Sequence, residues 1–68
     1  MDAEAEAAIR KAFQDAPPYN AQTIPERAKE HLNDLARGQE RIYRTIEEMV
    51  KNGTLDAAPQ RWKDWRLI

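Results

Sequence analysis

The feature that most constrains this chain is an amphipathic stretch from Ile24 to Asn52 with a glycine near its middle. Its apolar side chains recur at alternating spacings of four and three, which is the pattern of one helical face. A single helix of this length could act in a coiled coil. Alternatively, two helices turn near residues 36–38, where Gly38 costs a continuous helix about 1 kcal/mol. The seam comprises Ala28, Leu32, Leu35, Gln39, Ile42, Ile46 and Met49.

A shorter helix is predicted before this stretch, over residues 3–15. Asp2 can cap its N-terminus, and the acidic side chains that follow suit the helix macrodipole. Two prolines at positions 17–18 end this helix and leave residues 16–22 as a loop. Thr23 then offers an N-cap with a glutamate three positions later as its capping-box partner. The predicted inner face of the first helix is Ala5, Ala8, Ile9, Ala12 and Phe13.

Gly53 is predicted to end the amphipathic stretch as a left-handed C-cap. The chain changes character after it. Short strands over residues 54–57 and 64–67 can pair as a two-stranded ribbon, which needs a helical surface to be stable. Trp65 and Leu67 share one side of the second strand, so we expect Trp65 to pack the ribbon onto the helices.

A ribbon at 54–68 needs neighbouring helices to lie on. It therefore favours the interpretation in which the amphipathic stretch forms two helices with a turn between them. We therefore predict three helices, over 3–15, 24–35 and 39–52, followed by the ribbon in one small domain spanning the whole chain. The fold class is mainly α with a small β-ribbon. The alternative is an all-α helical hairpin or coiled coil in which residues 24–52 form one long helix.

Composition limits the core that such a chain can build. Leu, Ile, Val and Phe together number eleven of the 68 residues, while eleven alanines favour helix. A core of this size leaves about a few kcal/mol of net stability, so we expect a stabilising partner. No apolar run approaches the roughly 18 residues of a membrane span, and the acidic start does not suit a leader. The lack of cysteine fits a cytoplasmic or nuclear protein.

Three groups of residues resemble winged helix-turn-helix domains. Leu-Ala at 35–36 resembles the Leu-Gly pair that closes the second helix of such domains. Ile-Tyr at 42–43 resembles the Val-Tyr pair that begins the third helix of PadR-type regulators. Residues 51–55 resemble the charged-polar-Gly-x-Leu stretch that leads into the wing. The chain is thus similar to a three-helix winged helix-turn-helix over roughly residues 24–68.

The Trp-Arg-Leu at 65–67 lies where Z-alpha nucleic-acid-binding domains carry Trp-Lys-Ile. The contact residues of that family are missing, because Tyr43 stands at its contact asparagine and Glu47 at its contact tyrosine. The resemblance therefore implies a DNA-binding winged helix, as in transcription regulators or accessory DNA binders, without recognition of left-handed DNA.

The third predicted helix carries charged residues on the side opposite its apolar face. Arg41 and Arg44 can reach guanine edges or phosphates in a major groove. Glu47 and Glu48 oppose a polyanion unless they pair with neighbouring cations, so a solvated, salt-bridged face is the competing interpretation. The predicted nucleic-acid contacts are Gln39, Arg41, Arg44 and Lys51 on this helix and Arg61 and Lys63 on the wing.

Trp62 points to a second kind of partner. A tryptophan beside Arg61 is a typical anchor of protein interfaces, so we predict Trp62 as an interface residue. The pI near 5.8 and the neutral face of the third helix also suit a protein-binding adaptor or inhibitor module, such as mobile elements encode. The expected partner is double-stranded DNA or, alternatively, a protein, and a homodimer fits either.

Residue types for catalysis are scarce. His31 is the single histidine, and the chain has no serine, no cysteine and no glycine-rich phosphate loop. One histidine leaves a metal site to carboxylates, and their spacing is not that of an EF-hand. We therefore expect no enzymatic activity, no cofactor, no metal and no small-molecule substrate.

Overall fold

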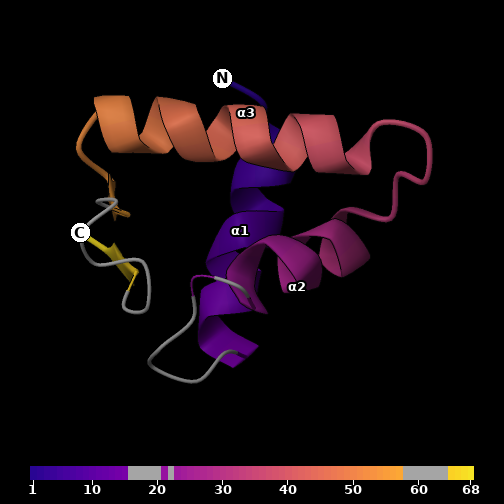
Figure 1. Ribbon diagram of the computed structural model, residues 1–68, viewed down its shortest axis with the longest axis horizontal. Helices are drawn as coiled ribbons and strands as arrows, with labels where there is room; N and C mark the ends of the chain where they lie inside the picture. Colours follow the sequence, from indigo (N-terminus) through magenta and orange to yellow (C-terminus); the bar gives the residue numbers. More distant parts are fainter. Residues whose placement is uncertain (16–20, 22, 58–64) are drawn as a thin grey trace.

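The computed structural model describes residues 1–15, 21, 23–57 and 65–68. Its elements are helices α1 (Ala3–Asp15), α2 (Thr23–Leu32) and α3 (Gly38–Lys51) and strands β1 (Leu55–Asp56) and β2 (Arg66–Leu67). Figure 1 shows α3 crossing α1, with the turn from α2 at one end of α3 and the ribbon at the other. The predicted class, mainly α with a small β-ribbon, is confirmed, and the arrangement is compatible with a winged-helix-like fold.

A turn over residues 33–37 breaks the amphipathic stretch, so the single-helix alternative is wrong. Asn33 adopts a left-handed conformation (φ 56°), which asparagine tolerates better than most residues and which stops α2. The Asp34 carboxylate accepts a hydrogen bond from the Arg37 amide at 3.0 Å, and the Asp34 carbonyl accepts one from Gly38 at 2.8 Å. This local bonding ends α2 at Leu32, earlier than the predicted residue 35.

A glycine ends α3 as predicted, with the helix shifted one residue toward the N-terminus from 39–52. Gly53 is left-handed (φ 82°), and its amide donates to the Val50 carbonyl at 3.2 Å. The Thr54 amide donates to the Met49 carbonyl at 2.9 Å. These two bonds form a Schellman motif, which closes the helix and turns the chain back toward β1.

The ribbon pairs β1 and β2 in antiparallel register, with Leu55 opposite Leu67 and Asp56 opposite Arg66. The strands are two residues each, shorter than the predicted 54–57 and 64–67. Leu67 and Trp65 are partly buried and pack against the core, which confirms the expected role of Trp65. The predicted loop at 16–22 lies outside the described residues apart from residue 21.

The core is built from one face of each helix and from β1. Small side chains of α1 let α2 approach closely. The larger apolar side chains of α3 pack against both of these helices. Leu35 was expected on the apolar side, but it is exposed, as is Val50 near the end of α3. Leu35 is exposed because it lies in the turn rather than in α2. The buried apolar residues are Ala5, Ala8, Ile9, Ala12, Ile24, Ala28, Ile42, Ile46, Met49 and Leu55.

The two glycines predict opposite responses to alanine. Gly53→Ala should lower the free energy of unfolding by about 1 kcal/mol, because a Cβ is strained at its positive φ. Gly38→Ala is the matched control and should raise it by about 0.5 kcal/mol, since an added Cβ meets its nearest atom at 3.9 Å and the position is helical. Urea unfolding measures both, and equal effects would contradict the helix end described above.

Thr45 predicts a stabilising substitution in the core. Its hydroxyl is fully buried on α3 and has no hydrogen-bond partner among the described residues. Thr45→Val keeps the shape and removes the desolvated hydroxyl, so it should raise the free energy of unfolding by about 1 kcal/mol. Thr45→Ser keeps the hydroxyl, loses the methyl group and should lower it by about 1 kcal/mol. A destabilised valine variant in urea unfolding would show that the hydroxyl is bonded in solution.

Candidate nucleic-acid interface on helix α3

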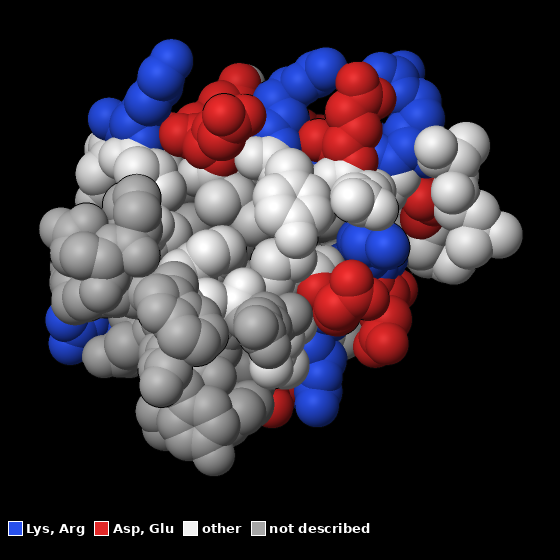
Figure 2. Space-filling view, viewed as in Figure 1, with Lys and Arg blue, Asp and Glu red and all other residues white. Residues whose placement is uncertain are grey.

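The outer side of α3 is exposed and carries mixed charge. The helix is amphipathic because its buried side chains recur three and four residues apart, which leaves the opposite side to solvent. Figure 2 shows Lys and Arg alternating with Asp and Glu along the edge of the molecule that α3 forms. The exposed residues of α3 are Gln39, Glu40, Tyr43, Arg44, Glu47, Val50 and Lys51.

Arg44 is one of the predicted contacts that the structure places in solvent. Its side chain is 60% exposed and forms an ion pair with Glu40 at 3.2 Å, one helical turn away. The other oxygen of Glu40 pairs with Arg37, also at 3.2 Å. Exposed pairs of this kind contribute little to stability, so a phosphate can replace Glu40 as the partner of either arginine at small cost.

Lys51 and Gln39 mark the two ends of this outer side. Lys51 is exposed in the last turn of α3, where the helix dipole favours a cation. Gln39 is exposed in the first turn and also lines a groove between α2 and α3. The remaining predicted residues, Arg61, Trp62 and Lys63, lie outside the described residues.

Arg41 differs from the other predicted contacts, because three carboxylates already surround its guanidinium. Its Nε and Nη2 donate to the two Asp2 oxygens at 2.7 and 2.9 Å. Its Nη2 also donates to Glu4 at 2.9 Å, and its Nη1 donates to Asp34 at 3.0 Å. We call these four residues the Arg41 cluster. The cluster joins the start of α1, the turn and α3. It lies at the edge of the outer side, where the Arg41 side chain is 23% exposed.

Hydrogen bonds in the cluster shift the pKa values of Asp2, Asp34 and Arg41. The hydrogen bond from Arg41 holds the pKa of Asp2 at about 2, with a second contribution from the Ala5 amide that Asp2 caps. The Arg37 amide and then Arg41 lower the pKa of Asp34. The surrounding carboxylates raise the pKa of Arg41. All three charges are therefore fixed at neutral pH.

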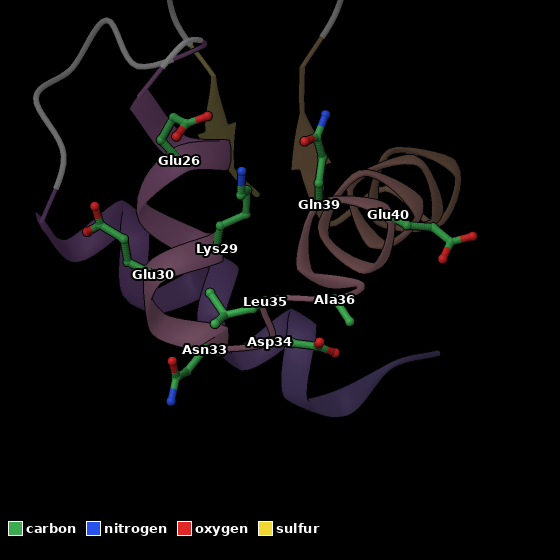
Figure 3. Close-up of a pocket in the computed structure, with 9 residues that line it drawn as sticks. All are labelled: Glu26, Lys29, Glu30, Asn33, Asp34, Leu35, Ala36, Gln39 and Glu40. Carbon is green, nitrogen blue, oxygen red and sulfur yellow. The ribbon is translucent and has the colours of Figure 1, made fainter.

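A groove between α2 and the start of α3 was not foreseen from the sequence. It has a volume of about 560 Å³, within the usual range of binding pockets. Figure 3 shows the Leu35 side chain lying between the two helices, while Glu40 points away from the groove. The signal for this feature was the Asn-Asp pair before Leu35, because these residues favour turns and take Leu35 out of the helix. The lining residues are Glu26, Lys29, Glu30, Asn33, Asp34, Leu35, Ala36, Gln39 and Glu40.

The single histidine of the chain takes part in a contact between two helices. His31 lies 2.7 Å from Asp15 and joins the C-terminal ends of α1 and α2 at the surface. Within the described ranges, no group of three or more His, Cys, Asp or Glu side chains is placed to hold a metal ion. In the same part of the chain, no helix has the length and apolar character needed to cross a bilayer.

Comparison of the chain with protein-family models, with curated proteins and with solved structures gives no match. Function is therefore inferred from the geometry of α3 and its surroundings.

The Arg41 cluster predicts how stability depends on pH. Because the pKa of Asp2 is about 2 in the folded protein and 3.8 ordinarily, its stabilising contribution is present above pH 3.8 and is lost as pH falls toward 2. In Arg41→Gln, the pKa of Asp2 should rise toward 3.8. The free energy of unfolding, measured in urea, should then fall less between about pH 5 and 2 than it does in the unmodified protein.

The control for this experiment is Arg10→Gln, which breaks an exposed ion pair with Glu6 instead. It should leave the pKa of Asp2 unchanged in an NMR titration. If the pKa of Asp2 stays near 2 in Arg41→Gln, Arg41 is not the main cause of the lowered pKa.

Proposed function

We propose that this protein is a small winged-helix DNA-binding protein, acting as a transcription regulator or an accessory DNA binder. The observation that carries the proposal is the placement of α3, which follows a tight turn from α2, precedes a ribbon and exposes Gln39, Arg44 and Lys51 away from the core. A helix presented in this way can enter the major groove of a duplex. Gln39 suits an adenine edge, while Arg44 and Lys51 suit guanine or phosphate.

The mixed charge of α3 sets the expected strength of binding. Glu40 and Glu47 share the outer side with Arg44 and Lys51, so the helix alone gives little net attraction to a polyanion. With Arg61 and Lys63 added, about four phosphate contacts would make the logarithm of the binding constant fall with the logarithm of salt at a slope of roughly −3.5. Binding should therefore be clear at low salt and weak near physiological salt.

Protein binding is a second candidate function, which the groove beside Leu35 favours. This side chain is fully exposed although it lies in a concave surface between two helices. Apolar side chains in such positions are common at protein interfaces. A protein-binding adaptor has no need of duplex DNA, so failure to bind duplex DNA at low salt would reject the first function and favour this one.

The DNA proposal predicts a selective effect of Arg44→Ala. Fluorescence anisotropy with a labelled 20-base-pair duplex should show binding about five- to tenfold weaker at low salt and a salt slope reduced by about 0.9, because one phosphate contact is lost. Arg10→Ala is the matched control, since Arg10 also pairs with a glutamate one turn away but lies on α1. Equal losses in the two variants would show that the binding is not through α3.

A further inference from the structure

Three arginines follow one another along one side of α3 and its N-cap. Arg37, Arg41 and Arg44 are spaced four and three residues apart, which places them on one side of the helix. We call them the arginine row. Arg37 was not among the residues predicted to contact nucleic acid, and it stands at the N-cap of α3 with its side chain 63% exposed.

Every member of the arginine row is paired with a carboxylate. Glu40 bridges the two outer members, Arg37 and Arg44, through its two oxygens. Arg41, in the middle, is surrounded by the carboxylates of its own cluster. The row therefore has the spacing of a cationic strip, while its charge is balanced by side chains of the same molecule.

These carboxylates differ in how firmly they are held. Glu40 is half exposed and bonds at 3.2 Å, so it is easily displaced. Glu4 is 77% exposed and holds Arg41 through one oxygen. Asp2 is less exposed, holds Arg41 with both oxygens and also caps α1. Two of the three carboxylates that hold Arg41 thus come from the start of α1, and the third, Asp34, comes from the turn.

We propose that the arginine row is a phosphate-binding strip for duplex DNA and that Asp2 and Glu4, at the start of α1, compete with DNA for Arg41. This inference rests on the proposed function. Asp2 occupies the guanidinium with the same paired-oxygen geometry that a phosphate offers, and Glu4 adds one further oxygen. Binding of DNA then exchanges carboxylate for phosphate at Arg41, and the start of α1 limits the affinity.

The experiment compares variants in anisotropy with the same labelled duplex at low salt. Asp2→Asn with Glu4→Gln should bind about five- to tenfold more tightly than the unmodified protein, because Asp34 is then the one carboxylate of the Arg41 cluster that still holds Arg41. Asparagine is a good N-cap, so α1 should be preserved. If circular dichroism shows this variant unfolded, Glu4→Gln alone keeps the Asp2 cap and should bind about twofold more tightly.

Two controls separate release of Arg41 from a general change in charge. Glu6→Gln with Asp15→Asn removes two carboxylates of α1 that do not contact Arg41, and it should change binding less than twofold. Adding Arg41→Ala to the Asp2 and Glu4 variant should abolish the gain. A gain that persists without Arg41, or one that the control variant equals, overturns the inference.

The role of Arg37 is tested in the same assay. Arg37→Ala should weaken binding about five- to tenfold, as Arg44→Ala does, and an unchanged affinity would remove it from the strip. If the unmodified protein binds and Asp2→Asn with Glu4→Gln brings no gain, the competition fails while the proposed function stands. If neither protein binds at low salt, the proposed function itself fails.

Discussion

The guanidinium group of Arg41 links three parts of this small protein: the start of α1, the turn after α2 and α3 itself. Arg41 bonds to the residue that caps α1, to the residue that shapes the turn and to Glu4 in the first turn of α1. Single exposed ion pairs contribute little, but paired bonds from arginine to a partly buried carboxylate fix geometry as well as charge. The cluster links α3 to the start of α1 close to the turn, while the buried face of α3 sets the side that the helix presents to solvent.

Asp34 connects the cluster to the backbone. One carboxylate oxygen accepts from the Arg37 amide and the other from Arg41, while its carbonyl accepts from Gly38. The same residue therefore shapes the turn and aligns α3 with the start of α1. Because the turn takes this form, Leu35 is placed in solvent beside the groove, and the arginine row begins at Arg37.

The local features of the fold and the packing of Trp65 could be predicted from the sequence, while the ion pairs between distant residues could not. The periodicity of α1, the left-handed Gly53 and the break near Gly38 follow from spacing and backbone preference, which are properties of neighbouring residues. Leu35 was misplaced because Asn33 ends α2 early, and apolar periodicity does not register a turn of five residues. The partners of Arg41 were missed because Asp2 is 39 positions away, and no spacing rule relates such residues. The exposure of Gln39, Arg44 and Lys51 needed only the helical repeat.

The brevity of the ribbon affects how the protein behaves at high concentration. A sheet edge invites another chain to add a strand when it offers a long, flat run of unpaired amide and carbonyl groups. Strands of two residues offer almost no such run, and the exposed Arg66 on β2 adds a charge that discourages close stacking of copies. In this part of the molecule, aggregation through cross-strand growth is therefore disfavoured by the geometry of the ribbon itself.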